Sequence, residues 1–280
     1  MLGLASALLW SLANLAIQPA SRRFGTFGAL ALAQALGVLL AVLAAWPLEG
    51  GPAWPDTVTW SWIFGAALAA VLAYGGLFDA LRRGRLSVCA PIISAWSALT
   101  VVVALVFYAE RPGRVGLVGV VMVLLGNVLL GRSSARDGAN RGEDGAIVSA
   151  LLSAVGFGLF VPALREVGAR TGELWAVAWV WGLELVIALP ILWRLGFLPR
   201  WPRGRDWRLV GLSGGLEVAG CIALSLAANL APMSEVAPAS SLTTAFSVSW
   251  GLLILRERLR PIAIAGAIAA SVGVLLVNAG

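Results

Sequence analysis

Ten apolar stretches, each about as long as a membrane-spanning helix, divide this chain. A helix needs about 20 mostly apolar residues to cross roughly 30 Å of hydrocarbon, and short breaks rich in Arg, Gly or Pro separate the stretches. The predicted helices cover residues 2–20, 26–46, 58–80, 87–108, 114–131, 146–164, 174–193, 207–229, 236–255 and 261–279. The sequence therefore predicts an all-α membrane protein with ten transmembrane helices, a multi-pass protein of the cell (inner) membrane.

The composition favours the lipid bilayer as a partner and argues against nucleic acid. Of the 280 residues, 60% are hydrophobic and 12% are charged, so a soluble fold would leave much apolar surface exposed to water. The basic residues are all arginines, and they stand in short clusters between the apolar stretches, as membrane-flanking charges do. Because the chain has no lysine, it has no P-loop for phosphate binding, which excludes an ATP-driven pump within this chain.

The apolar stretches form two copies of one pattern. Positions near the start recur 143 residues later, and positions farther along recur 147 residues later. The pairs are Pro19, Arg22 and Gly25 with Pro162, Arg165 and Gly168, and then Trp46, Trp54, Pro55 and Trp60 with Trp193, Trp201, Pro202 and Trp207. We expect one five-helix repeat over 1–132, a connecting loop over 133–145 and a second five-helix repeat over 146–280. Because five is odd, the second repeat enters the membrane from the opposite side, so the repeats are inverted.

The arginines are unevenly divided between the two sets of loops. Sixteen of the 20 lie in loops that follow predicted helices 1, 3, 5, 7 and 9, and four lie in the other loops. Matching loops also differ, because 49–57 contains no arginine while its copy contains Arg200, Arg203 and Arg205. Inverted repeats place matching loops on opposite sides of the membrane, so they require this difference in arginine content. The positive-inside rule then places the arginine-rich loops in the cytoplasm and both termini outside.

Several of these residues resemble the pattern of the drug/metabolite transporter superfamily, and within it the ten-helix proteins with two EamA-type repeats. The resemblance covers essentially the whole chain. It rests on Leu9-Trp10-Ser11 with Asn14, on Pro91 to Glu110-Arg111 followed by Gly119 and Gly126, and on Pro238 to Glu257-Arg258 followed by Gly266 and Gly273. It implies a secondary transporter, often an exporter of amino acids, nucleotide sugars, amines or drugs, with a central cavity between the halves. It also implies that both termini lie inside, opposite to the arginine count.

Small hydroxyl side chains recur in predicted helices 4 and 9. Ser94, Ser97 and Thr100 return 147 residues later as Ser241, Thr244 and Ser247. A spacing of three keeps each set on one broad face, and matching hydroxyls in two inverted helices suit a midplane site between the repeats. We expect these six residues to line one water-accessible cavity. Hydrogen bonding of buried Ser and Thr to the backbone is the alternative interpretation.

Five more residues are candidates for the same cavity. Asn14 and Gln34 carry amides that favour the interior of a helix bundle. Trp10, Trp96 and Trp181 lie deeper in their helices than the other tryptophans do, so they could line a cavity or fill the core.

Glu184 and Glu217 lie in the middle of apolar helices. A charge there costs on the order of 3 kcal/mol, so each should face partner groups or water. Their counterparts by the 147-residue shift are Gly37 and Ala70, so the pair breaks the repeat symmetry. We expect them, Glu217 first, to recognise a cationic or zwitterionic substrate or to exchange a proton for it. The alternative is that each is neutral and hydrogen-bonded in a packed interface.

The residues point to transport and not to catalysis. Asp79 should form a local ion pair with Arg82 and Arg83 at a helix end. The chain has no His, and Cys89 and Cys221 lie in apolar stretches, so we predict no metal, no cofactor and no catalytic residue. The sequence predicts a secondary transporter that exports an amino acid, amine or drug-like compound by alternating access. A membrane-embedded enzyme that uses the buried glutamates is the alternative, and the inverted duplication argues against it.

Overall fold

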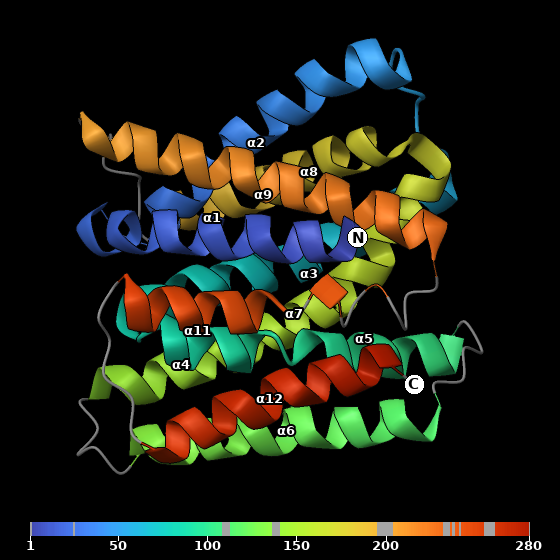
Figure 1. Ribbon diagram of the computed structural model, residues 1–280. Coiled ribbons are helices and arrows are strands. Elements are labelled where there is room, and N and C mark those ends of the chain that lie inside the picture. Colours follow the sequence, from blue (N-terminus) through green and yellow to red (C-terminus); the bar gives the residue numbers. More distant parts are fainter. Residues whose placement is uncertain are drawn as a thin grey trace.

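The computed structural model describes residues 2–24, 26–107, 113–135, 141–194, 204–231, 236, 239–240, 242–254 and 261–279. Within these ranges the chain forms helices joined by short connections, and it forms no strand (Figure 1). The helices are α1 (Leu2–Phe24), α2 (Thr26–Glu49), α3 (Thr57–Arg83), α4 (Leu86–Ile93), α5 (Trp96–Phe107), α6 (Arg114–Ala135), α7 (Arg141–Thr171), α8 (Glu173–Arg194), α9 (Arg205–Leu230), α11 (Thr243–Leu253) and α12 (Pro261–Ala279). The residues Glu110, Arg111, Pro238, Ser241, Glu257 and Arg258 lie outside the described part.

Within the described part of the chain, six helices are long and apolar enough to cross a membrane. They are α1, α2, α3, α7, α8 and α9. Their outer faces carry large apolar side chains that water would not favour, such as Leu43, Phe64 and Val186, which are 61%, 53% and 66% exposed. The prediction of a multi-pass helical membrane protein is therefore confirmed. The number ten stays a prediction.

One predicted helix is divided in two. The sequence predicts a continuous helix over 87–108, but α4 ends at Ile93 and α5 begins at Trp96. The N–H of Ala95 donates to the carbonyl of Ile92, three residues back, over 3.1 Å instead of continuing the α-helical pattern. Pro91 lies just before the break, and because it has no N–H it leaves one bond of the helix unmade.

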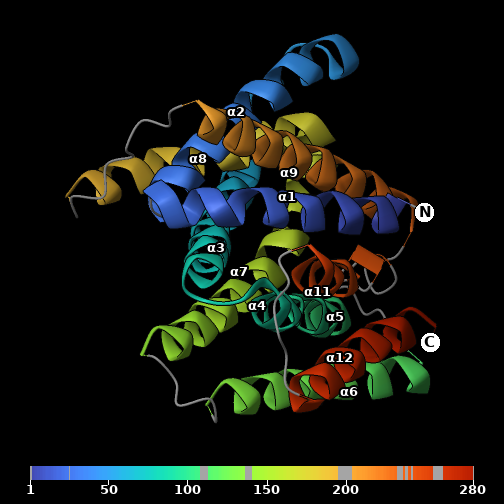
Figure 2. The same ribbon diagram turned by 60° about the vertical axis from the view of Figure 1, so that its left-hand side comes forward.

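Helices that are far apart in the sequence pack side by side. α1 lies along α9, α3 along α7, α2 against α8, α4 against α11 and α6 along α12 (Figures 1 and 2). Gly156 makes the α3–α7 contact possible, because a Cβ atom on it would clash with the backbone nitrogen of Ala73.

The glycines spaced seven apart on α6 and α12 are buried, which suits close contact between helix backbones. They are Gly119, Gly126, Gly266 and Gly273.

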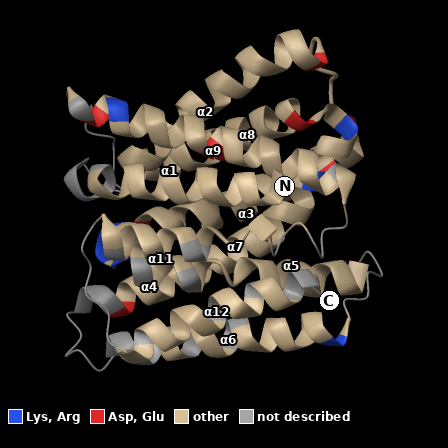
Figure 3. Cartoon of the chain, in the orientation of Figure 1, with Lys and Arg blue, Asp and Glu red and all other residues tan. Residues whose placement is uncertain are grey.

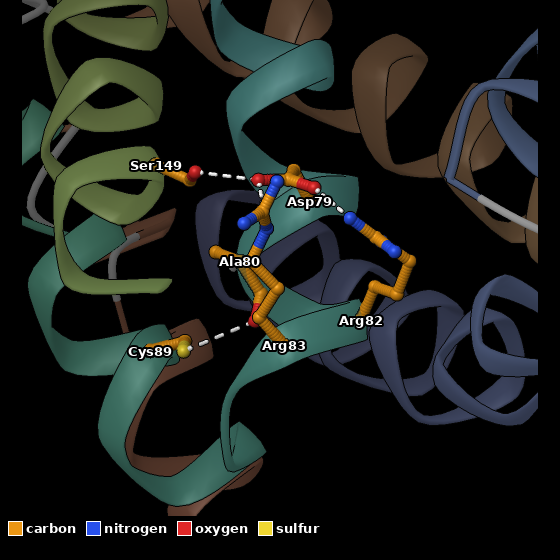
Figure 4. A network of polar contacts seen from close by, with 6 residues as sticks. All are labelled: Asp79, Ala80, Arg82, Arg83, Cys89 and Ser149. Atoms are coloured by element: carbon orange, nitrogen blue, oxygen red, sulfur yellow. Dashed lines mark hydrogen bonds and ion pairs between the residues drawn. The ribbon is translucent and has the colours of Figure 1, made fainter. Parts of the chain in front are cut away.

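Most of the charged residues lie near the two ends of the bundle (Figure 3). At one end, Asp79 of α3 pairs with Arg82 over 2.9 Å and with Arg83 over 2.7 Å, which confirms the predicted local ion pair. The hydroxyl of Ser149 on α7 also donates to the carboxylate of Asp79 over 2.8 Å (Figure 4). The end of α3 is thus fixed to α7, a helix from the other half of the chain.

A second polar contact joins the halves where α2 ends and α8 begins. The N–H groups of Leu174 and Trp175 donate to the carboxylate of Glu49 over 2.9 and 3.2 Å. The indole N–H of Trp175 donates to the carbonyl of Gly50 over 3.1 Å. The first N–H groups of a helix have no partner within it and favour an anion, so Glu49 caps α8 from another helix. Because α3 runs from the end of α2 to the other end of the bundle, this contact and the Asp79 network lie at opposite ends.

Candidate functional site

A cavity lies between helices from both halves of the chain. The cavity is small, with room of about 30 Å³ for the centres of water-sized molecules, and it is partly open to the surroundings. α1, α3, α4, α5, α7, α9 and α11 contribute to its wall. The lining residues are Trp10, Asn14, Leu77, Leu81, Ala90, Ile93, Ser94, Trp96, Phe157, Glu217 and Thr243.

Glu217 on α9 is the charged residue in this lining. The structure thus places this candidate residue at the cavity, and its role in substrate or proton binding stays a prediction. Its side chain interacts with that of Tyr74 on α3. The hydroxyl of Tyr74 also lies 3.7 Å from the sulfur of Cys221, one helical turn beyond Glu217. Glu217 thus has a polar partner behind it and the cavity in front of it.

Aromatic rings form the wall beside this carboxyl group. Trp10 packs edge-to-face on Trp96, with ring centroids 6.2 Å apart, and against Phe157 at 6.5 Å. Tyr74 packs edge-to-face on Phe157 at 5.0 Å. Gly220 lets Trp10 lie against α9, because a Cβ atom there would come within 2.5 Å of the indole ring. A carboxylate beside aromatic rings is an arrangement that attracts organic cations.

Glu184 on α8 lies outside the cavity lining and is 2% exposed. It interacts with the side chain of Gln34 on α2, but both amide atoms of Gln34 and Oε2 of Glu184 lack a hydrogen-bond partner of good geometry. Trp181, one turn earlier on α8, packs edge-to-face on Tyr74 at 5.6 Å. Gln34, Trp181 and Glu184 therefore lie outside the lining, and Glu217 is the carboxyl group that borders the cavity.

The six candidate hydroxyl residues do not share one environment. Ser94 lines the cavity. The hydroxyl of Ser97 donates to the carbonyl of Ser94 over 3.1 Å, and that of Thr100 donates to the carbonyl of Gly158 over 3.4 Å. Ser247 is buried, and its hydroxyl has no hydrogen-bond partner among the described residues. Ser241 and the side chain of Thr244 lie outside the described part of the structure.

Polar contacts hold α11 and Ser240, three residues before its first residue, against α1. The hydroxyl of Ser6 donates to that of Ser240 over 2.8 Å. The hydroxyl of Thr243 lies 2.7 Å from the carbonyl oxygen of Ser240 and 3.2 Å from that of Ala7, and it can donate to either. Farther along, the indole N–H of Trp250 donates to the hydroxyl of Ser11 over 3.1 Å. These bonds fix Thr243 beside Trp10 in the cavity wall.

Comparison with known proteins identifies the family. The model of the EamA-like transporter family, part of the drug/metabolite transporter superfamily, matches residues 1–132 and 145–279. The chain belongs to this family. Membership of the EamA family indicates a membrane transporter of the drug/metabolite type. The described residues give no support for an enzymatic role.

A solved structure has the same fold as this EamA protein. That structure, named only "Crystal structure of protein", is 20% identical to this chain and superposes with a TM-score of 0.70. The match covers 99% of this chain and 95% of that one. A comparison with curated proteins gives no significant match.

Sequence reasoning missed two polar or aromatic residues of the lining, Phe157 and Thr243. The repeat offsets could have found both, because Phe157 lies 143 residues after Asn14 and Thr243 lies 147 residues after Trp96. Leu77, Leu81, Ala90 and Ile93 also line the cavity. These four are apolar residues in apolar helices, so no sequence signal separates them from core residues.

Proposed function

We propose that this EamA-family protein is a secondary transporter that exports a small cationic or zwitterionic metabolite through the cavity between its two halves. The observation that carries the proposal is the position of Glu217, a carboxyl group within a membrane-spanning helix that borders a cavity walled by Trp10, Trp96 and Phe157. An intramembrane carboxyl group that faces a cavity is a functional position by default, because keeping it there is costly.

The packing of the helices supports two inverted repeats, 1–132 and 146–280, as the scaffold of this cavity. In such a scaffold α1 corresponds to α7 and α3 to α9, so the contact of α1 with α9 corresponds to that of α3 with α7. The pairs α2 with α8 and α6 with α12 each join corresponding helices. Tyr74 and Cys221, which are 147 residues apart, touch each other, as corresponding residues near a two-fold axis would.

The lining favours a substrate with a positively charged nitrogen. Glu217 offers one negative charge, and no basic residue stands in the described lining to oppose it. Trp10, Trp96 and Phe157 add ring faces that attract cations. α5 begins at Trp96 and α11 begins at Thr243, so the positive ends of two helix dipoles border the cavity and could hold the carboxylate of a zwitterion.

A buried carboxyl group also provides a means to couple transport to protons. Removal from water favours the neutral form of any carboxyl group, whereas an ammonium group beside it favours the charged form. Substrate binding at Glu217 would then release a proton, and proton binding would release the substrate. One carboxyl group in the cavity is enough for this exchange, so the proposal does not need Glu184.

The two polar contacts at opposite ends of the bundle suit alternating access. The Asp79 network joins α3 to α7 at one end, and Glu49 joins α2 to α8 at the other. Each contact bridges the two halves of the chain. A transporter that exposes its cavity to one side at a time must loosen one of these ends while it closes the other.

Proteoliposome transport tests the proposal. Radiolabelled amines and amino acids are screened in purified, reconstituted protein, and the accepted substrate is measured at several pH values. Glu217→Gln keeps the size of the side chain but cannot ionise, so we expect it to abolish transport or to remove its pH dependence. Glu184→Gln is the matched control, a buried glutamate outside the lining, and it should keep the pH dependence. Unchanged transport and pH dependence in both variants would reject the proposal.

A further inference from the structure

Two polar side chains besides Glu217 border the central cavity with polar atoms that have no partner. Asn14 on α1 and Ser94 at the α4–α5 junction belong to the lining, and they are 9% and 4% exposed. Within the described part of the chain, neither side chain forms a hydrogen bond with another residue. Their polar atoms are not fully covered by protein, whereas the amide nitrogens of Gln18 and Gln34 are. A molecule in the cavity can therefore reach the carboxamide of Asn14 and the hydroxyl of Ser94.

Asn14 lies at the same level of the cavity as Glu217. α1 and α9 lie side by side and run in opposite directions (Figure 1). Trp10 of α1 packs against α9 at Gly220. One turn after Trp10 on α1 therefore lies beside the turn before Gly220 on α9, which brings Asn14 to the level of Glu217. The side-chain contact found for Glu217 is with Tyr74 and not with Asn14, so the carboxylate and the carboxamide border the cavity without binding each other.

The break between α4 and α5 adds a backbone acceptor to the cavity wall. In a continuous helix the N–H of Ser97 would donate to the carbonyl of Ile93, four residues back. It donates instead to the carbonyl of Ser94 over 3.3 Å, so the carbonyl of Ile93 loses its helical donor. Ile93 is part of the cavity lining. Carbonyl groups at such breaks in membrane helices can bind cations.

These acceptors separate two kinds of organic cation that the aromatic wall does not. Ring faces attract primary and quaternary ammonium groups alike. A primary ammonium group has three N–H donors, enough for Glu217, Asn14 and Ser94. A trimethylammonium group has the same charge but no N–H, so it would leave the acceptors unpaired, and a site built for hydrogen bonding rejects such an analogue.

The size of the cavity favours the same choice. Its room of about 30 Å³ for the centres of water-sized molecules is enough for about two waters. An ammonium group is about as large as one water molecule, whereas a trimethylammonium group carries three more carbon atoms. The smaller head group fits beside Glu217 without movement of the aromatic rings.

We propose that the cavity selects its substrates by the N–H donors of their cationic head group, so that it binds primary amines and rejects quaternary ammonium compounds. Glu217 supplies the charge, and the carboxamide oxygen of Asn14 and the hydroxyl of Ser94 accept the other two hydrogen bonds. Asn14 is then a residue that determines specificity. This inference rests on the proposed function, in which Glu217 binds the cationic group of the substrate.

The experiment compares two amines that differ in their N-methyl groups alone. Radiolabelled ethanolamine and choline are bound to the purified protein in detergent by equilibrium dialysis near neutral pH, where each carries one positive charge. Phenethylamine and its N,N,N-trimethyl derivative repeat the comparison with an aromatic tail. Binding at the site is the part that Glu217→Gln removes. We expect the primary amine of each pair to bind about 100-fold more tightly than the quaternary one.

Variants of the uncharged acceptors test how the choice is made. Asn14→Leu keeps the approximate size of the side chain and removes the carboxamide. It should weaken binding of the primary amine by about tenfold and leave that of the quaternary one unchanged, as loss of one hydrogen bond to a charged group does. Ser94→Ala should narrow the preference in the same direction. Gln18→Leu is the matched control, because Gln18 is a buried amide on α1 outside the lining, and it should keep the full preference.

The outcomes separate this inference from the proposed function. Equal binding of the two compounds of a pair, lost in Glu217→Gln, would overturn selection by N–H donors and leave the proposed function standing. A preference that Asn14→Leu does not change would assign the choice to size and overturn the role of Asn14. Binding that Glu217→Gln does not reduce, or no binding of any of the four compounds, would reject the cation site and this inference with it. The comparison in wild-type protein does not depend on the folding of the Asn14 and Ser94 variants, and gel filtration checks theirs.

Discussion

Gly75 and Gly76 are neighbours on α3 but have different surroundings. A Cβ atom on Gly76 would lie 2.5 Å from the carbonyl oxygen of Ser149 on α7, while one on Gly75 would meet nothing within 4 Å. We therefore expect Gly76→Ala to lower the free energy of unfolding by about 1–3 kcal/mol, because α7 must move away. Gly75→Ala should leave it unchanged or raise it by about 0.5–1 kcal/mol, since alanine favours the helix. Thermal melting in detergent compares the two, and equal melting temperatures would show that α3 and α7 do not pack closely at Gly76.

Asp56 makes a pH-dependent contribution at the start of α3. Its side chain accepts a hydrogen bond of 2.7 Å from the N–H of Thr59, and the hydrogen bonds with Thr59 hold the pKa of Asp56 below its usual value of 3.8. A carboxyl group whose pKa is lowered by folding stabilises the protein above the unfolded pKa and loses this effect as pH falls through the folded pKa. We expect Asp56→Ala to melt at a lower temperature than wild type near neutral pH, with the gap narrowing below pH 3.8. A gap that stays constant with pH would contradict this.

The two mid-helix glutamates show how far residue-level prediction extends. Both could be singled out from the sequence, because a carboxyl group in an apolar helix needs a partner or a cavity. Which of them faces the cavity could not be derived, since this depends on the rotation of α8 and α9 within the bundle. Glu184 turns toward Gln34, and Glu217 turns toward Trp10 and Asn14. A periodicity signal is weak here because both faces of these helices are apolar.

At the scale of elements, the sequence predicts where helices lie better than how they end. The apolar stretches locate α2, α3, α8 and α9 to within a few residues. The break between α4 and α5 is weakly signalled in the sequence, because Pro91 suits either a plain helix start or a break that exposes backbone to a cavity. The cap of α8 by Glu49 could not be derived either, because the two residues it joins are 125 positions apart.

That cap leads to a prediction about α8. Glu49→Ala removes the acceptor for two backbone N–H groups, those of Leu174 and Trp175, and should lower the free energy of unfolding by about 1 kcal/mol, as loss of a helix cap does. Glu49→Gln keeps one oxygen acceptor and should fall between alanine and wild type. Denaturant titration in detergent measures the order. A glutamine variant as unstable as the alanine variant would mean that the charge, and not the hydrogen bonds, secures this contact.

At the scale of the whole molecule, the two halves form one cavity that neither contains alone. The first half brings Trp10 and Asn14 on α1 and Ser94 and Trp96 at the α4–α5 junction, while α7, α9 and α11 bring Phe157, Glu217 and Thr243. In the proposed scaffold of two repeats, the position that corresponds to Glu217 is Ala70, a fully buried core residue. A substrate bound as we propose would therefore meet one negative charge that has no counterpart in the other half.

The arginines lead to a prediction of how the helices are oriented in the membrane. α6 ends at Ala135 and α3 ends at Arg83, in the arginine-rich set of loops, while the exposed loop residue Gly51 belongs to the other set. Since arginine-rich loops stay in the cytoplasm, a cysteine at Ser134 should resist an impermeant maleimide in intact cells and react after permeabilisation. Gly51→Cys should react in intact cells, because a side chain there meets nothing within 4 Å. The native Cys89 and Cys221 are buried, so background labelling should be low. The reverse pattern, Ser134→Cys labelled and Gly51→Cys protected, would place both termini in the cytoplasm, as the family resemblance implies, and would show that the arginine count does not set the topology of this chain.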